Sequence, residues 1–246
     1  KKRGSKPFAL MVLDLETAGR IVELTPEAEN LLRSSMRPIV LLPRREGAPV
    51  SRWVAPGLQT LGVMLPYTPL HYLLLQKTRD KFLIMTSGNV HGDPMIKDEV
   101  SLKDLMKIAD YALVHNRRIV HRVDDSVVRP TYGGQVILRY GRGYAPKIMR
   151  LSRKLSNCVI AYGAELETAG AIGFDDKIIL AQYSGDTDNP KVLQEHEENL
   201  RFLSDCYGLR ERGKVVVAAD MHPGYRSRAA AEKFSAENGF ELKLIQ

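Results

Sequence analysis

Residues 81–89 read Lys-Phe-Leu-Ile-Met-Thr-Ser-Gly-Asn, an apolar block that runs directly into a polar turn. The length and composition of the block predict a buried strand over 81–85, which the turn at 86–89 ends. Residues 101–106 then predict a helix, with Ser101 at its N-cap and Asp104 in its first turn. Strand, turn and helix in this order favour an α/β fold, in which ligands bind beyond the carboxyl ends of strands.

The same alternation extends over the rest of the chain. We expect further strands at 38–43, 136–139, 158–163, 177–181 and 214–219, a helix that begins at Thr25-Pro26-Glu27, and helices over 189–207 and 227–237. Apolar runs at 10–15 and 21–24 predict two more strands around a turn at 17–20. Strands separated by helices indicate an α/β architecture, and the pattern leaves open whether some strand pairs are antiparallel.

Charge divides the chain into two unlike halves. Residues 1–150 carry 24 Lys and Arg against 14 Asp and Glu, a net of +10, whereas residues 151–246 carry 12 against 15, a net of −3. The basic half favours an anionic ligand, but the acidic half would repel a polyanion laid across both, so a small anionic ligand is the preferred interpretation. A polar, basic stretch at 150–154 predicts a linker between Tyr144 and Asn157. We therefore expect two domains, 1–150 and 151–246.

Several classes of protein and site are disfavoured. The longest near-apolar stretches are short, and the apolar block after the basic N-terminus is too short for a signal peptide, so we expect no membrane partner. Cys158 and Cys206 have no CxxC neighbour, which argues against a zinc site or disulfide framework and fits buried thiols in a reducing cytosol. The six histidines show no i, i+4 pairing, so no metal site is predicted. Neither G-x-x-x-x-G-K-[ST] nor G-x-G-x-x-G occurs, so ATP would bind in another way.

Two polar segments near the first strands could bind phosphate. Lys1 and Arg3 occupy alternate positions before a predicted strand, where they would project from one face. Two cations on one face suit a triphosphate, and a solvated basic N-terminus is the alternative. Thr86, Ser87 and Asn89 place hydroxyl and amide groups at the end of a strand, although ordinary turn chemistry has the same composition.

Charged residues gather in a second region, between 122 and 142. Asp124 and Asp125 lie between arginines and could coordinate magnesium, but ion pairing is the favoured interpretation. Arg139 and Arg142 belong to a glycine-rich turn that can approach a phosphate closely and bind it with two parallel hydrogen bonds.

Ordered motifs along the whole chain resemble the HypF family. Residues 1–9, KKRGSKPFA, are similar to the family's KxRxxKPFA opening, and residues 61–71 match its long GVMLPYTPLH block. The segments 85–89, 115–117, 124–129 and 142–146 follow in the family's order. This half is similar to the YrdC domain, which also occurs in enzymes that make threonylcarbamoyl-adenylate for tRNA modification. The resemblance implies a YrdC-like twisted open sheet with helices and a basic groove that binds ATP.

The resemblance also implies which residues bind ATP or carbamoyl-adenylate. Lys1 and Arg3 match the KxR pair, and Ser87 and Asn89 match the SxN motif. A later family serine corresponds to Ser126, and the arginine that closes on the nucleotide corresponds to Arg139. The predicted binding residues are Lys1, Arg3, Thr86, Ser87, Asn89, Ser126, Arg139 and Arg142. Magnesium would bridge phosphate oxygens, and no side-chain nucleophile is required.

Residues 151–246 resemble the first part of the family's transfer domain, which has an actin-like and Hsp70-like (ribonuclease H-like) α/β fold. The segments 163–166, 184–189 and 220–225 carry the match. Glu167-Thr168-Ala169 stands where the family usually has Lys-Asn-Thr, which reverses a charge expected beside phosphates. Gln246 aligns with the residue before the family's metal-binding histidines. We therefore expect a fragment whose Zn²⁺ or Fe sites would lie outside this chain.

The function implied is that of an ATP-dependent, cytoplasmic carbamoyltransferase of [NiFe]-hydrogenase maturation. Carbamate from carbamoyl phosphate would attack ATP to give carbamoyl-adenylate, and the carbamoyl group would pass to the C-terminal cysteine of the acceptor protein HypE. Three alternatives stay open: threonylcarbamoyl-adenylate synthesis, O-carbamoyltransfer to a small molecule, and a non-enzymatic RNA-binding module. Nucleic acid is disfavoured because the chain lacks interleaved aromatics and its second half is acidic.

Overall fold

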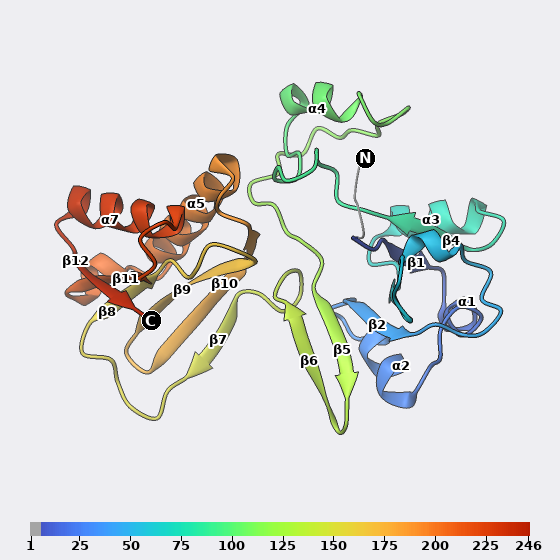
Figure 1. The fold of residues 1–246 in the computed structure, drawn as a ribbon, viewed down its shortest axis with the longest axis horizontal. Helices are drawn as coiled ribbons and strands as arrows, with labels where there is room; N and C mark the ends of the chain where they lie inside the picture. Colours follow the sequence, from blue (N-terminus) through green and yellow to red (C-terminus); the bar gives the residue numbers. More distant parts are fainter. Residues whose placement is uncertain (1–5) are drawn as a thin grey trace. The chain divides into compact units, whose positions relative to one another are not determined.

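The structure, a computed structural model, describes residues 6–246, apart from the side chains of Glu99 and Val100. It consists of two compact units (Figure 1). Unit 1 holds the chain up to His91 together with Asp124–Gly143, and unit 2 holds Gly92–Val123 together with Tyr144–Gln246. Both units mix helices with a six-stranded sheet, which confirms the α/β class. No helix in the described part of the chain has the length and apolar character needed to cross a membrane.

Unit 1 is built on a sheet with the strand order β4-β1-β3-β2-β5-β6. Its strands are β1 (Ala9–Val12), β2 (Ile39–Pro43), β3 (Thr60–Met64), β4 (Phe82–Met85), β5 (Val127–Thr131) and β6 (Gly134–Arg139), and its helices are α1 (Leu15–Gly19), α2 (Pro26–Arg33) and α3 (Pro69–Lys77), with a short 3₁₀ turn at Arg52–Val54. β1 pairs with β3 and β2 with β5 in parallel, and the other neighbours are antiparallel. The fully buried side chains of Leu10, Val40 and Val63 fill its centre.

The strands predicted at 38–43, 81–85 and 136–139 are confirmed as β2, β4 and β6. The predicted burial of 81–85 is wrong, because the residues of β4 are at most partly buried and Ile84 is exposed. The helix predicted at Thr25 is confirmed as α2, since the Thr25 hydroxyl accepts a hydrogen bond from the Ala28 amide at 3.3 Å. The strand predicted at 21–24 is wrong, because only Val22 forms a single bridge, to Arg44. Asp14 accepts from the Thr17 amide at 2.8 Å and starts α1, so the chain turns into a helix where a turn between strands was expected.

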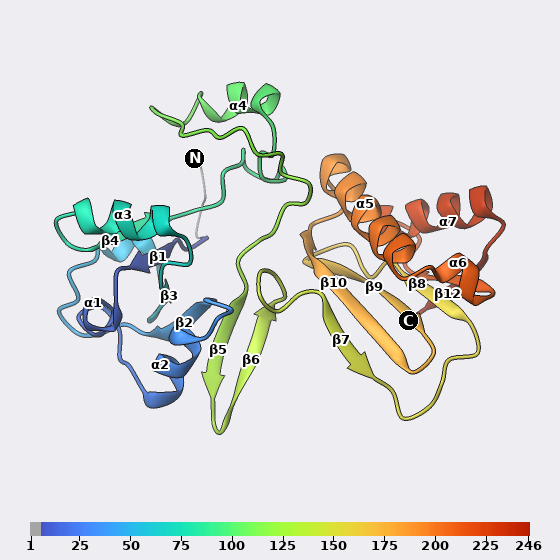
Figure 2. The same cartoon turned by 180° about the vertical axis from the view of Figure 1, so that it is seen from behind.

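Unit 2 is built on a sheet with the strand order β12-β11-β8-β9-β10-β7. Its strands are β7 (Lys147–Arg150), β8 (Cys158–Ala161), β9 (Thr168–Phe174), β10 (Lys177–Gly185), β11 (Val215–Asp220) and β12 (Glu241–Ile245), and its helices are α4 (Glu99–Leu105), α5 (Pro190–Cys206), α6 (Leu209–Arg212) and α7 (Arg226–Asn238). α5 and α7 cover one face of this sheet (Figure 2). Ile160, Tyr162, Ile172 and Val217 belong to the core between the sheet and these helices.

The strands predicted at 158–163, 177–181 and 214–219 and both long helices are confirmed as β8, β10, β11, α5 and α7. Three details are wrong. Residues 147–150 lie inside the predicted linker but form β7, which pairs with β10. Ser101 is inside α4, because Asp98 caps this helix by accepting from the Ser101 amide at 2.8 Å. Cys206 is exposed, and only Cys158 is the buried thiol that was expected. The domain division at residue 150 stays a prediction.

A buried carboxylate starts α7. Glu165, which is 8% exposed, accepts from the backbone amides of Arg226 (2.8 Å) and Ser227 (3.3 Å), the first two residues of that helix. The Thr187 hydroxyl donates to the same carboxylate at 3.3 Å. A carboxylate stabilises a helix N-terminus because it satisfies unpaired amides and opposes the positive end of the helix dipole. Glu165 therefore ties the loop after β8 to α7.

His196 on α5 is fully buried and joins two strands of unit 2. Its Nε2 lies 2.9 Å from the carbonyl oxygen of Tyr162, so Nε2 carries the proton and donates it. Nδ1 then accepts from the Ser184 hydroxyl at 3.0 Å. Burial lowers the pKa of His196 from 6.5 to about 4, because the charged imidazolium would lose its hydration.

This shift predicts a loss of stability in mild acid. In the unfolded chain His196 takes up a proton below its ordinary pKa of 6.5, but in the folded chain only near 4. Stability is therefore full above 6.5 and falls as the pH decreases toward 4. Between about pH 7.5 and about pH 5 the free energy of unfolding should fall by about 2 kcal/mol on account of this group. Urea unfolding followed by circular dichroism at both pH values measures the loss.

His196→Gln should lower stability at neutral pH and remove most of this acid-side loss, because glutamine can still donate to Tyr162 but cannot titrate. His222→Gln, at an exposed position in the same unit, is the matched control and should retain the loss. An equal pH dependence in both variants would contradict the assignment.

Candidate functional site

The Arg142 guanidinium is the centre of a polar network in unit 1. Its Nε and Nη2 donate to Asp125 Oδ1 at 3.2 and 2.8 Å. Nη1 donates to the carbonyl oxygen of Met36 at 2.7 Å, and Nη2 also donates to that of Arg37 at 2.8 Å. These bonds join the turn before β2 to the loops that flank β5 and β6. Because one guanidinium makes all these bonds, Arg142 fixes the positions of these segments relative to one another.

Tyr67 completes the network from the loop after β3. Its ring lies under the Arg142 guanidinium, with 3.5 Å between the guanidinium carbon and the ring centre. Burial, and then the charge of Asp125, raise the pKa of the Tyr67 hydroxyl. His71, in the first turn of α3, contacts the ring edge-on at 4.5 Å, and burial lowers its pKa. Both shifts favour the neutral forms of these groups around one partly buried ion pair.

Ser126 is buried and ties the same loops together. Its hydroxyl accepts from the Gly141 amide at 2.8 Å and donates to the carbonyl oxygen of Arg142 at 3.1 Å. Gly141 is required there, because a Cβ at this position would lie 2.2 Å from the carbonyl oxygen of Asp124. The structure thus brings Ser126 and Arg142 together, and both support the backbone around Asp125. Their predicted contact with ATP stays a prediction.

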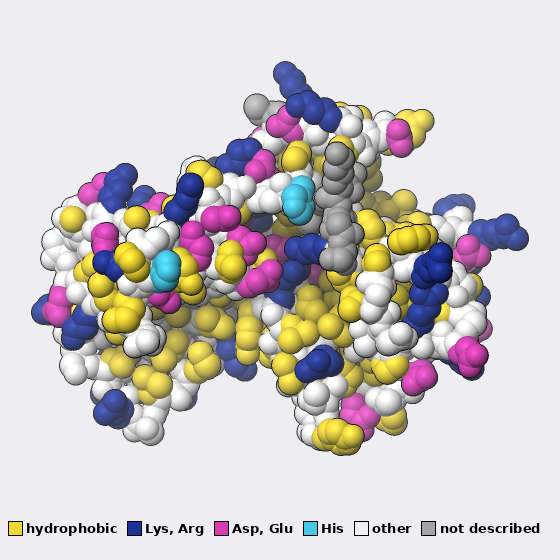
Figure 3. Space-filling model, in the orientation of Figure 1, with side chains coloured by type: hydrophobic (Ala, Val, Ile, Leu, Met, Phe, Trp, Pro, Cys, Tyr) yellow, Lys and Arg dark blue, Asp and Glu magenta, His cyan; other side chains and the backbone are white. Residues whose placement is uncertain are grey.

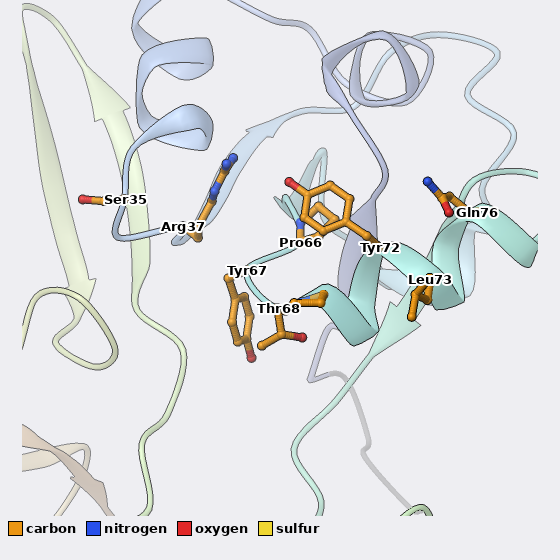
Figure 4. Close-up of a pocket in the computed structure, with 9 residues that line it drawn as sticks. Ser35, Arg37, Pro66, Tyr67, Thr68, Tyr72, Leu73 and Gln76 are labelled. Atoms are coloured by element: carbon orange, nitrogen blue, oxygen red, sulfur yellow. The ribbon is translucent and has the colours of Figure 1, made fainter.

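An open pocket of about 580 Å³ lies beside this network (Figure 4). One wall is the turn with Ser35 and Arg37, and the other is the start of α3, with Tyr67 and Tyr72. Pro66, Thr68, Pro69, Leu73 and Gln76 complete the lining. Tyr72 and Arg37 extend toward the same space (Figure 4). Arg142 contacts both walls, since it bonds to the Arg37 carbonyl and stacks on Tyr67.

Thr86, Ser87 and Asn89 lie at another part of the sheet. β4 runs antiparallel to β1 with Met85 opposite Ala9, so these residues lie beyond the end of the ladder at which β1 begins. The Ser87 hydroxyl donates to Asn89 Oδ1 at 2.6 Å, and the Asn89 amide donates to the Ser87 carbonyl at 3.0 Å. Lys1 and Arg3 precede β1 and lie outside the described residues. The register brings the start of β1 and the SxN turn to one edge.

Ser126 and Arg142 lie at the other end of the unit 1 sheet, away from the SxN turn. Val127 pairs with Ile39, and Val40 pairs with Val63, which places the start of β5 where β3 ends. Arg139 ends β6 there, with its Nη1 4.0 Å from Asp124 Oδ1. Ion pairing of both aspartates is thus confirmed. In residues 6–246 no group of three or more His, Cys, Asp or Glu side chains is arranged to hold a metal ion.

The loop of unit 2 that departs from the family pattern is acidic. Glu167 has a left-handed backbone (φ 49°), and its amide donates to Asp186 Oδ1 at 2.8 Å. Glu167, Asp186 and Asp188 are all exposed. Figure 3 shows acidic side chains gathered on this face of unit 2, over the loops that follow β8 and β10. Such a surface repels phosphate.

Two family models cover most of the chain. Residues 1–141 match the family of Sua5, YciO and YrdC, described as "Telomere recombination", and residues 154–246 match the "HypF Kae1-like domain". A probable carbamoyltransferase HypF of Methanocaldococcus jannaschii is 37% identical over 99% of this chain, and a carbamoyltransferase HypF of Synechocystis sp. is 39% identical over 94%. The chain belongs to the HypF family. It spans about a third of the length of these relatives, 32% and 30% respectively.

Solved structures of the HypF family agree with this fold. Full-length HypF in its phosphate- and nucleotide-bound form superposes with a TM-score of 0.90, at 37% identity, over 100% of this chain and 38% of its own. HypF of T. kodakarensis superposes with a TM-score of 0.92, at 37% identity, over 99% of this chain and 32% of its own. The YrdC-like and transfer-domain folds implied by the resemblance are therefore confirmed.

Some residues of the Arg142 network were not predicted as site residues. Tyr67 and His71 belong to the GVMLPYTPLH block, so the motif marked their region without assigning them a contact. Met36 and Arg37 contribute only backbone carbonyl groups and lie 106 and 105 residues from Arg142. A carbonyl contact across such a separation leaves no signal in the side-chain pattern.

Arg142→Lys should destabilise unit 1, because a lysine cannot replace the fork of bonds to Asp125 and two carbonyl groups. We expect the free energy of opening β2 and β5 to fall by about 2 kcal/mol. Hydrogen exchange of peptides from these two strands measures it. Arg129→Lys, at an exposed position on β5, is the matched control. Equal protection in both variants would show that the network contributes nothing to stability.

Proposed function

We propose that this HypF-family chain forms carbamoyl-adenylate from ATP and carbamate in unit 1, as a step of ATP-dependent carbamoyl transfer. The observation that carries the proposal is the superposition, over the whole chain, on HypF in a phosphate- and nucleotide-bound form. The relatives' name, carbamoyltransferase, supports the group transferred. Unit 1, residues 1–91 and 124–143, carries 16 Lys and Arg against 9 Asp and Glu, a net of +7, which suits an anionic ligand.

The proposed reaction needs positioning and charge neutralisation more than a side-chain nucleophile. A carbamate oxygen attacks the α-phosphorus of ATP, the bond to the bridging oxygen breaks, and pyrophosphate leaves. Lys1 and Arg3, which precede β1, would neutralise phosphate oxygens beside the SxN turn. Arg139 would contribute its charge from the opposite end of the strands, where it pairs with Asp124. Ser87 and Asn89, with Thr86 beside them, would orient the nucleotide and the carbamoyl group. Mg²⁺ would arrive with ATP, since Asp124 and Asp125 face arginines.

Ser126 and Arg142 have a different proposed role from the other predicted site residues. The Arg142 guanidinium makes four hydrogen bonds inside the protein, and the Ser126 hydroxyl makes two. We therefore assign them the support of the loops around Asp125, and not direct phosphate contact. In the second step, a thiolate would attack the carbamoyl carbon and release AMP. The proposed acceptor is the C-terminal cysteine of HypE.

Pyrophosphate release from ATP by the 246-residue chain tests the first step. Carbamate supplied from ammonium bicarbonate should support release, whereas threonine with sodium bicarbonate should not. Release that requires threonine would assign the chain to threonylcarbamoyl-adenylate synthesis instead. No release in either mixture, together with salt-sensitive RNA binding, would favour the non-enzymatic alternative. Because the chain covers about a third of its relatives, the same assay with carbamoyl phosphate belongs to the longer protein.

Asn89→Ala and Arg3→Ala should each weaken ATP binding by at least about tenfold, since each removes a charged or amide contact with the nucleotide. Isothermal titration with ATP measures the dissociation constant. Lys77→Ala removes an exposed cation from the last turn of α3 and should leave the affinity unchanged. Unchanged affinity in both site variants would refute the binding assignment.

A further inference from the structure

The pocket beside the Arg142 network contains a cation, Arg37, for which the described side chains of residues 6–246 provide no ion pair. The residue is half-buried, and its Nη1 donates to the carbonyl oxygen of Leu32 at 3.1 Å. Asp125, the acid of the neighbouring network, pairs with Arg142 instead. A guanidinium carries five N–H donors, so one carbonyl oxygen uses only part of what Arg37 can donate. The pocket wall therefore presents a positive charge to a ligand.

The backbone of Arg37 is held on both sides. It has a left-handed conformation (φ 46°), which is uncommon for a residue with a side chain. Its amide donates to the carbonyl oxygen of Ser34 at 3.1 Å, and its own carbonyl oxygen accepts from Arg142 Nη2 at 2.8 Å. The buried Pro38 follows directly. Because this backbone is already fixed, a ligand that binds Arg37 has only the side chain to order.

The rest of the lining is mostly aromatic and apolar. Tyr72 and Leu73 on α3 are 39% and 61% exposed, and they line the pocket together with two prolines. Gln76, one turn after Tyr72, adds a side-chain amide. Figure 4 shows Tyr72 and Arg37 extending toward the same space. The Tyr67 ring already stacks on a guanidinium, so Tyr72 offers the ring on which a ligand can pack.

Volume and chemistry together define the class of ligand. The volume, about 580 Å³, is typical of small-molecule sites, which are mostly apolar with a few polar groups. A single cation matches a singly charged anion, and a planar carboxylate can accept two parallel hydrogen bonds from a guanidinium. The exposed ring of Tyr72 favours a second aromatic ring, since such rings pack in offset or edge-on pairs.

We propose that this pocket of unit 1 is a binding site for an aromatic monocarboxylate, whose carboxylate bonds to Arg37 and whose ring packs on Tyr72. The site is separate from the proposed nucleotide site. Its Tyr67 wall follows the end of β3, whereas the SxN turn lies beside the start of β1, at the other end of the parallel β1–β3 pair. Neither Ser87 nor Asn89 is among the residues that line it. The proposal therefore does not depend on ATP binding.

Two probes of the same shape test the charge requirement. Indole-3-acetate carries the carboxylate and the ring, and indole-3-acetamide carries the ring without the charge. Titration followed by ligand-observed NMR should give a dissociation constant of about 1 mM or lower for the acid, as expected for a ligand of this size in an open site. The acid should bind at least about tenfold more tightly than the amide. Equal affinities for both probes, or no binding of the acid, would overturn the proposal.

Two variants separate the roles of the cation and the ring. Arg37→Gln keeps a donor for the Leu32 carbonyl oxygen, removes the charge, and should weaken the acid about tenfold while the amide binds as before. Arg33→Gln, at an exposed position in the last turn of α2, is the matched control and should change neither affinity. Tyr72→Ala should weaken both probes. Undiminished acid binding in Arg37→Gln would contradict the assignment, and Tyr72→Ala still tests the site if Arg37→Gln does not fold.

Hydrogen exchange and ATP competition locate the site. Binding of the acid should slow exchange at 34–38 and in the first turns of α3, because the ligand contacts both walls. An excess of ATP should leave the affinity for the acid unchanged. Displacement of the acid by ATP would overturn a separate site and assign the pocket to the nucleotide. A chain that does not bind ATP would refute the proposed function and leave this test intact.

Discussion

The hydrogen bonds of the Arg142 guanidinium are the interactions on which the loops beside β2, β5 and β6 of unit 1 depend. A cation that is removed from most of its water needs several acceptors, and Asp125 with the carbonyl groups of Met36 and Arg37 supplies them. The same cation holds the Tyr67 ring. Three segments far apart in the sequence thus take positions set by one planar group, and the walls of the pocket at Arg37 and Tyr67 follow from it.

Unit 2 also contains a charged group that is removed from water, but its charge is negative. Glu165 is a buried carboxylate, and the amides at the start of α7 together with the Thr187 hydroxyl satisfy it. A side chain thereby occupies a helix terminus that would otherwise attract an anion. With exposed Glu167 and Asp186 on the neighbouring loops, this region of unit 2 favours cationic over anionic groups. The contrast with basic unit 1 agrees with nucleotide binding in one unit only.

The pattern of neighbouring apolar and turn residues predicted those strands and helices that such neighbours alone determine. The proline-bounded block at 38–43 and the apolar run at 177–181 form strands in which alternate residues are buried. The errors at the turn predicted over 17–20 and at Ser101 share one cause, a nearby aspartate that caps a helix. The motifs located the candidate loops. The carbonyl partners of Arg142 could not be predicted, because they lie more than a hundred residues away and use no side chain.

The assignment of residues 92–123 shows why chain order and structural unit differ. By sequence the segment lies inside unit 1, between β4 and β5, yet most of its charged contacts are with α5. The spacing of Lys191, Glu195 and Glu198 is visible in the sequence as a charged helix face, which by itself is expected to be solvated. Burial of Arg122 and Glu195 distinguishes the two cases. A charged helix face is removed from water where a second segment brings complementary charges to it, as Arg122 does beside Glu195 at 3.0 Å.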